Sequence, residues 1–179
     1  MNIHYSRATS AQELKQILEL QTINLRSVIS TNESRKEGFV SVVHTLDLLE
    51  RMNTAAAHIL AKEGEKVVGY ALCMHPAFAD EIPMLKPMFK RVNEQVGPHY
   101  KFMIMGQICI GKQYREKGIF RELYKAMAAA LFPAYESIIT EVDTDNQRSL
   151  QAHYAIGFEE MEVYRSGGRQ WHLIQLKNK

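Results

Sequence analysis

The sequence predicts one α/β domain, of the α+β kind, in which helices flank a mixed central β-sheet. Its 179 residues suit a single domain that buries a sizeable core. Segments with the two-residue period of strands alternate with segments that have the 3.6-residue period of helices. No internal repeat, low-complexity tract or linker interrupts them, so we expect one domain over residues 1–179.

The first part of the chain predicts a strand, two helices and a β-hairpin. Residues 3–7 alternate as a short strand does. Ser10 and Glu13 then have capping-box spacing at the start of a helix. The apolar face of this helix comprises Leu14, Ile17, Leu18 and Leu25. The other elements predicted here are a helix over residues 39–52 and two hairpin strands over residues 57–62 and 66–74.

The second part begins with an irregular connection over residues 75–100, which four prolines punctuate. A connection of this length is usually functional or mobile. Pro133 ends a helix that begins near residue 119, and Gly157 suits the position that follows a helix. The predicted elements are a short helix at residues 84–92, a strand at 101–110, a helix at 119–132, a strand at 137–142, a helix at 146–156 and strands at 158–164 and 171–176.

Composition and charge exclude several classes of protein. The formal net charge is only +2, with dispersed Lys and Arg, so we expect no nucleic-acid partner. No apolar run approaches the roughly 20 residues of a membrane span, and the N-terminus lacks the pattern of a secretory signal. Cys73 and Cys109 lie in apolar strand-like runs, which predicts buried, reduced thiols of a cytoplasmic protein. A disulfide would require neighbouring strands, and a metal site would require more ligands, so none is expected.

Two neighbouring segments have the features of phosphate-binding loops. Gly106, Gly111 and Lys112 match a nucleoside-triphosphate P-loop. The residues between these glycines are apolar and β-branched, however, which predicts a strand rather than a flexible loop. Gln113 also replaces the hydroxyl residue that binds magnesium, so we reject the P-loop.

The second segment is a turn that leads from a strand into a helix. Arg115 and Lys117 supply positive charge, and Gly118 permits close backbone approach where the helix begins. The first N–H groups of a helix have no partner within it and bind phosphate well. On these residues alone, an ordinary strand, turn and helix with a solvated basic turn is the simpler reading.

A further motif changes this balance. Asn146 is followed by Ser149, then by His153, and then by Gly157 and Phe158. Together with the Arg-x-x-Gly turn, this pattern resembles the GNAT superfamily of acetyl-CoA-dependent N-acetyltransferases, from about residue 101 to residue 158. The resemblance implies a GNAT-like fold, acetyl-CoA as cosubstrate and no metal.

By this resemblance, a set of residues would bind the cofactor. The family's cofactor turn corresponds to Arg115, Glu116, Lys117, Gly118, Ile119 and Phe120. Phe120 departs from the usual small residue, and Lys112 stands where these proteins often have proline. The pantetheine arm would pair with the backbone of Ile108 and Ile110, in a gap where the strand at 107–110 splays from the strand at 137–142. An N–H near Cys109 would polarise the thioester, while Asn146 and Ser149 complete the set.

The resemblance leaves the proton-transfer groups open. Many relatives carry a tyrosine where this chain has His153, and Tyr154 follows it. The two side chains leave a helix about 100° apart, so only one can face the sulfur. We predict His153 as the general acid, and a purely structural His153 is an equal alternative. Gln107 occupies the place of the usual glutamate base and cannot take up a proton. Other carboxylate or imidazole groups that could relay a proton are His75, Asp80, Glu81 and Glu141.

The acceptor pocket is expected to lie between the first two helices and the connection at 75–100. The candidate lining residues are Phe78, Met84, Met88, Phe89 and Tyr100, with Asp80 and Glu81 attracting the amine. The predicted function is transfer of an acetyl group from acetyl-CoA directly to a primary amine of a small molecule or peptide. The alternatives are a catalytically weak or inactive acyl-CoA-binding regulatory module and a nucleotide-dependent transferase. Dimers are common in the family, so a homodimer stays open.

Overall fold

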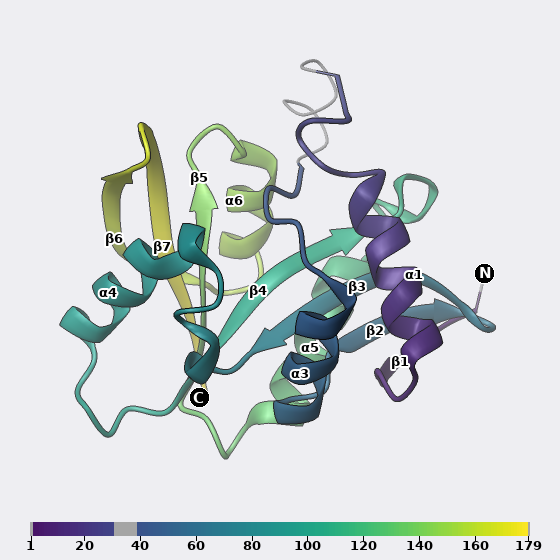
Figure 1. Cartoon of the computed structure of the whole chain (residues 1–179), viewed down its shortest axis with the longest axis horizontal. Coiled ribbons are helices and arrows are strands. Elements are labelled where there is room, and N and C mark those ends of the chain that lie inside the picture. The colour runs from purple at the N-terminus through teal and green to yellow at the C-terminus, as the bar shows by residue number, and fades with distance from the viewer. Residues whose placement is uncertain (1, 31–38, 179) are drawn as a thin grey trace.

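A computed structural model describes residues 2–30 and 39–178, whose strands form one seven-stranded sheet (Figure 1). The spatial order of the strands is β1-β2-β3-β4-β5-β7-β6. Their bounds are β1 Ile3–Arg7, β2 Ile59–Glu63, β3 Lys66–Met74, β4 Phe102–Ile110, β5 Ser137–Asp143, β6 Glu159–Ser166 and β7 Arg169–Lys177. Neighbours are antiparallel except β4 and β5, which are parallel. The predicted mixed sheet is confirmed.

Helices cover both faces of this sheet. The α-helices of the described residues are α1 Ala11–Thr22, α3 Leu46–Ala55, α4 Lys86–Gln95, α5 Ile119–Leu131 and α6 Gln147–Tyr154. The first three pack their apolar sides on one face, and α5 and α6 cover the other. Figure 1 shows α1 and α3 in front of the sheet and α5 behind it. None of the helices in residues 2–30 and 39–178 is both long and apolar enough to cross a membrane.

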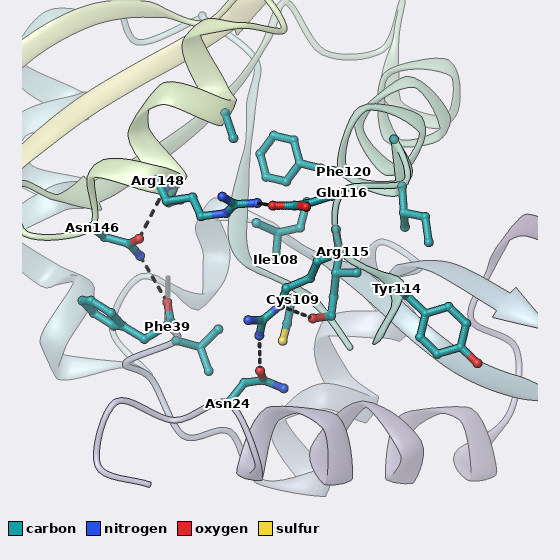
Figure 2. Close-up of a pocket in the computed structure, with 16 residues that line it drawn as sticks. Asn24, Phe39, Ile108, Cys109, Tyr114, Arg115, Glu116, Phe120, Asn146 and Arg148 are labelled. Atoms are coloured by element: carbon teal, nitrogen blue, oxygen red, sulfur yellow. Dashed lines mark hydrogen bonds and ion pairs between the residues drawn. The ribbon is translucent and has the colours of Figure 1, made fainter. Parts of the chain in front are cut away.

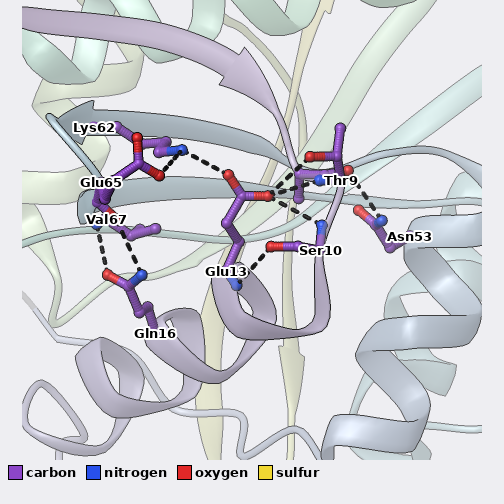
Figure 3. Close-up of polar contacts among 9 residues, drawn as sticks. Thr9, Ser10, Glu13, Gln16, Asn53, Lys62, Glu65 and Val67 are labelled. Carbon is purple, nitrogen blue, oxygen red and sulfur yellow. Dashed lines mark hydrogen bonds and ion pairs between the residues drawn. The ribbon is translucent and has the colours of Figure 1, made fainter.

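A buried ion pair fixes α1 to the sheet (Figure 3). The predicted capping box is present, because Ser10 and Glu13 bond each other's backbone N–H groups. Glu13 also accepts a hydrogen bond of 2.8 Å from the Lys62 ammonium on β2. Burial alone would raise the pKa of Glu13, but Lys62 and the Thr9 and Ser10 N–H groups lower it to about 2. The ion pair therefore fixes the position of α1, and with it the position of the residues at its C-terminal end that contribute to the site.

The predicted helix at 39–52 is wrong over its first seven residues. Helix α3 begins only at Leu46, after Thr45, whose side chain caps it. Val40 instead forms a β-bridge with Leu25, which lies beyond the end of α1. Residues 39–45 are rich in β-branched side chains, which suit an extended chain as well as an apolar helix face. Val43, whose spacing would place it on the apolar face of a helix, is 68% exposed.

The two central strands separate as they approach their C-terminal ends. Strand β4 pairs with β5 only from Phe102 to Ile104. Past this point, Thr140 still donates a hydrogen bond of 3.0 Å to the Met105 carbonyl. The register between β3 and β4 then shifts, so Gly106 is an extra residue and forms a β-bulge. The strand from Gly106 to Ile110 remains paired with β3 on one side and borders a gap in the sheet on the side that faces β5.

Candidate active site

The gap between β4 and β5 opens toward the turn that precedes α5. A short 3₁₀ turn, Lys112–Tyr114, follows β4, and Gly118 is the N-cap of α5. Glu116 and Gly118 both have left-handed backbone conformations, with φ of 62° and 78°. No side chain caps α5, and no atom lies within 4 Å of where a Cβ on Gly118 would be. The start of this helix is therefore accessible to an anion.

A cleft of about 250 Å³ lies over this turn (Figure 2). Ten of the eleven residues predicted to bind the cofactor line it: Ile108, Cys109, Ile110, Arg115, Glu116, Gly118, Ile119, Phe120, Asn146 and Ser149. The eleventh, Lys117, is outside this lining, and its ammonium donates a hydrogen bond of 2.7 Å to the Gln113 carbonyl. The structure thus brings together two motifs that are about 30 residues apart in the sequence.

Sequence reasoning missed part of the lining of this cleft. The additional residues are Asn24, Phe39, Val40, Tyr114, Arg148 and Ala152. Arg115 donates a hydrogen bond of 2.5 Å to the Asn24 side chain, which lies just beyond α1. Arg148 forms an ion pair of 3.1 Å with Glu116, from one side of the cleft to the other (Figure 2). Asn24 carried no sequence signal, whereas Arg148 lies within the recognised motif on α6.

The two cysteines are free and buried, as predicted. Burial raises the pKa of each thiol to about 12, so both remain protonated at neutral pH. Cys109 lines the first cleft but has no thiolate with which to attack an acyl group.

A second, smaller cleft of about 100 Å³ adjoins the first. Five residues line both clefts: Phe39, Val40, Ile108, Asn146 and Ser149. Of the residues predicted for the acceptor pocket, Met84 and Met88 line the second cleft. Phe78 and Phe89 are buried in the core instead, and Tyr100 packs against it. The residues at 39–42, which were predicted to be helical, form an extended wall of this cleft.

Gln107, which the resemblance places at the position of a glutamate in many relatives, is held by a buried network of hydrogen bonds. Its side-chain oxygen accepts from Tyr70 at 2.6 Å and from Gln21 at 2.9 Å. Its amide nitrogen donates to the Val42 carbonyl at 2.9 Å. The network joins α1, β3, β4 and the extended segment, so Gln107 fixes one wall of the second cleft.

Asn146 and His153 hold α6 beside the two clefts. Asn146 caps α6 through its side-chain oxygen and donates its amide to the Phe39 carbonyl at 3.3 Å. His153 is 1% exposed, and its Nδ1 lies 2.7 Å from the Ser149 carbonyl oxygen. Because a carbonyl only accepts, Nδ1 carries the proton, and Nε2 accepts from the Tyr124 hydroxyl at 2.7 Å. Burial lowers the pKa of His153 to about 4, so the ring is neutral.

Tyr154, the other predicted acid, points elsewhere. Its hydroxyl donates a hydrogen bond of 3.0 Å to Glu160 on β6, and it is not among the residues that line the two clefts. Whether His153, Tyr154 or neither donates a proton stays a prediction.

Of the four groups proposed to relay a proton, only Glu141 lines a cleft. Burial raises the pKa of Glu141 to about 7, and the nearby Asp143 carboxylate adds to this, while a short hydrogen bond from Tyr164 opposes it. Glu81 instead pairs with Arg51, and Asp80 pairs with Lys86 at the surface. His75 caps a 3₁₀ turn. A carboxylate with a pKa near 7 suits a general base.

Residues 18–158 match the family described as Acetyltransferase (GNAT) family, which is more than half of the chain. The chain belongs to the GNAT acetyltransferase family. No curated protein sequence matches it. The seven-stranded α+β fold is accordingly that of a GNAT protein, and the chain is a GNAT-family acyltransferase.

Three of the solved structures that this GNAT chain resembles are described by their TM-score, sequence identity and coverage. The ribosomal-protein-S18-alanine N-acetyltransferase from Escherichia coli has a TM-score of 0.65 at 10% identity, with 98% of this chain and 94% of that one covered. Arabidopsis thaliana Naa50 in complex with the bisubstrate analogue CoA-Ac-MVNAL has 0.67 at 14%, with 99% and 100% covered. Salmonella typhimurium yncA with its cofactor acetyl-CoA has 0.65 at 14%, with 99% and 94% covered. At these identities, the likeness shows the fold.

Residues 106–112 of this GNAT protein do not form the P-loop that was rejected from the sequence. Gly106 to Ile110 belong to β4, and Gly106 is the bulge residue. A glycine within a strand often marks a bulge, so the sequence carried a signal for this feature.

Proposed function

We propose that the protein is an N-acetyltransferase that moves an acetyl group from acetyl-CoA directly to a primary amine of a small molecule or peptide. One observation carries this proposal. The gap between β4 and β5 joins an accessible helix start at Gly118 to a second cleft that contains a carboxylate suited to take up a proton. The first cleft thus contains a group that can bind phosphate, and the adjoining second cleft contains a group that can remove a proton.

The residues around the first cleft fit acetyl-CoA. The start of α5, from Gly118 to Phe120, would hold the pyrophosphate through backbone N–H groups, with Arg115 and Lys117 nearby as positive charge. Backbone groups of β4 from Ile108 to Ile110 border the gap, where an extended pantetheine arm can pair as a strand does. When bound, acetyl-CoA supplies an activated acyl group.

Glu141 is the base that the geometry favours for the acceptor amine. It lies on β5 and lines the second cleft, which adjoins the first. Above about pH 7 its carboxylate can accept the proton that the amine loses, either directly or through water. Because the Cys109 thiol remains protonated, the arrangement supports direct transfer rather than an acyl-cysteine intermediate.

We propose that His153 positions α6 rather than donating a proton, so the CoA sulfur leaves as a thiolate and takes its proton from solvent. Its single ring proton is bonded to the Ser149 carbonyl, and its other nitrogen accepts from Tyr124. Ser149 of α6 lines both clefts, so its hydroxyl lies where the two clefts meet. The homodimer, the cytoplasmic location and the lack of a metal stay predictions.

The test is calorimetric titration of the protein with acetyl-CoA, CoA and Mg-ATP, beside a Gly118→Glu variant. The new carboxylate would stand where the pyrophosphate is proposed to bind, in a backbone conformation that strains a side chain. We expect the variant to lose acetyl-CoA binding by at least tenfold.

Gly64→Glu is the matched control. Gly64 also has a positive φ, of 59°, and open space around its Cβ position, but it lies in the β2–β3 turn. The control separates loss of the phosphate site from backbone strain. If wild-type protein binds neither CoA ligand, the proposed function is wrong. If it binds acetyl-CoA but releases no thiol with any amine, the regulatory-module alternative is favoured.

A further inference from the structure

The second cleft has predominantly apolar walls. The apolar side chains that line it, apart from those shared with the first cleft, are Val42, Met84, Leu85, Met88, Ile104, Met105, Val142 and Trp171. Its volume of about 100 Å³ is smaller than the roughly 150 Å³ of an engineered cavity that binds benzene. Methionine side chains adapt to the shape of an apolar partner. The cleft therefore suits an aliphatic or thioether group better than an aromatic ring.

Most polar side chains in this lining already have internal partners. Gln107 bonds three other residues, and Thr140 donates to the Met105 carbonyl. The Asn146 amide and oxygen are both used, and so are both ring nitrogens of His153. A polar substrate side chain would lose its bonds to water and gain few in return, which costs binding energy.

The charges in the lining point the same way. Among the described residues that line the second cleft, the only charged side chains are Glu141 and Asp143, and none is a lysine or arginine. Asp143 is buried and is bonded by Arg26 at 3.2 Å and by Arg169 at 3.0 Å. A carboxylate on the substrate would lie near Glu141 with no lysine or arginine in the lining to pair with it. A second positive charge on the substrate would have no carboxylate left to pair with once Glu141 has bound the amine.

We infer that the acceptor is a primary amine carried beside a compact, uncharged aliphatic or thioether group, such as the α-amine of a methionine or leucine residue. This rests on the proposed function, because it names the substrate class of the same site. The partly exposed Met84, in the 3₁₀ turn Pro83–Leu85 that precedes α4, extends the apolar wall toward solvent. An amine of this kind would bury its apolar group against the three methionines while its nitrogen reaches Glu141.

The test is a series of α-amines of similar basicity, measured by thiol release at saturating acetyl-CoA. The series comprises methioninamide, leucinamide, glycinamide, aspartic acid α-amide and argininamide. Spermidine, a more basic polyamine that is not an α-amine, is measured beside this series. We expect kcat/KM for methioninamide and leucinamide to exceed the values for the other amines by at least about tenfold, the scale of selectivity for a buried apolar group. Adding a Met-initiated tetrapeptide amide distinguishes a peptide N-terminus, if it reacts faster than methioninamide, from a small amine.

A pair of surface variants distinguishes an effect of the second cleft on activity from the general effect of adding a surface charge. Met84→Glu places a charge in the apolar wall at a residue that is 55% exposed, so folding should be retained. It should lower kcat/KM for methioninamide at least tenfold, with acetyl-CoA binding unchanged. Val163→Glu, on β6 and outside both clefts, is the matched control and should have no such effect.

The outcomes distinguish the inference from the function on which it rests. Equal or faster reaction of glycinamide, the charged amides or spermidine would overturn the inference and leave the acetyltransferase function standing. An unchanged selectivity in Met84→Glu would also count against it. Binding of acetyl-CoA without thiol release for any amine would overturn the proposed function itself.

Discussion

At the scale of single residues, Glu141 is the side chain whose pKa and position best suit it to accept a proton in the site. Its pKa of about 7 results from burial together with the nearby Asp143 charge, and Tyr164 moderates it by donating a hydrogen bond. In the sequence, this residue is one of four equal alternatives. Only the fold separates it from Asp80, Glu81 and His75, because it alone lines a cleft.

We predict that Glu141→Gln lowers kcat/KM at least about 100-fold, the scale of lost base catalysis. For the wild type, kcat/KM should rise with pH through about 7, where Glu141 ionises, and the variant should lose this rise. Tyr164→Phe is a companion variant. It removes a hydrogen bond that lowers the pKa of Glu141, so it should shift the rise to higher pH. Rate profiles between pH 5.5 and 9 provide the measurement, and an unaltered profile in Glu141→Gln would exclude this residue as the base.

Gln107→Glu, which restores the glutamate of many relatives, should not raise activity. A carboxylate there would place an acceptor against the Val42 carbonyl, or would have to be protonated to donate to it. We expect a loss of about 1–3 kcal/mol in the free energy of unfolding, measured by urea denaturation. A variant that is as stable as wild type and more active would contradict the assigned role of Gln107.

At the scale of elements, the site depends on how α5 and α6 meet behind the sheet. Tyr124 of α5 and His153 of α6 share a hydrogen bond, and Phe120 and Phe158 pack edge-on against the His153 ring. Phe120 is the residue that departs from the family's small residue. Its ring occupies space beside His153, so the two unusual residues of the motif contact each other.

Tyr124→Phe should destabilise the protein by about 1–3 kcal/mol, because it leaves the buried Nε2 of His153 without a donor. Urea denaturation would measure this. Tyr5→Phe, at a half-buried tyrosine beside the same core, is the control and should cost less. If Tyr124→Phe is neutral in stability, the proposed positioning role of His153 loses its support.

At the scale of the whole molecule, three buried histidines make stability depend on pH. Burial is the main cause that lowers the pKa values of His44, His58 and His153 to about 4 from an unfolded value of 6.5. Their contribution to stability is complete above about pH 6.5 and is lost as the pH falls toward 4, since the unfolded chain takes up protons that the folded state refuses. Glu141 acts in the opposite direction between pH 4.5 and 7, because its folded pKa is raised.

The histidines outnumber the glutamate, so we predict that the free energy of unfolding falls by about 2–4 kcal/mol between pH 7 and pH 5. Urea denaturation at the two pH values measures the change. Glu141→Gln should make the fall steeper, because it removes the opposing group. A stability that rises on acidification to pH 5 would be incompatible with three neutral histidines.

The sequence by itself determined much of this protein. The alternation of periods predicted the strands, because side-chain spacing along each element reflects which face it buries. The glycine turn at Gly118 and the Asn146 motif predicted the family through their resemblance to its motifs, and the helix start at Gly118 explains why such a turn can bind phosphate. These features are local, so a single segment is enough to reveal them.

The tertiary structure decided the rest. Residues 39–45 carry an apolar pattern that fits either a helix or an extended chain, and only the bridge from Val40 to Leu25 selects the second. Asn24 joins the first cleft because α1 ends beside β4, and Glu141 differs from the other acids through its burial. Burial, pKa and the continuity of two clefts depend on contacts between distant segments, and no local pattern in the sequence encodes these contacts.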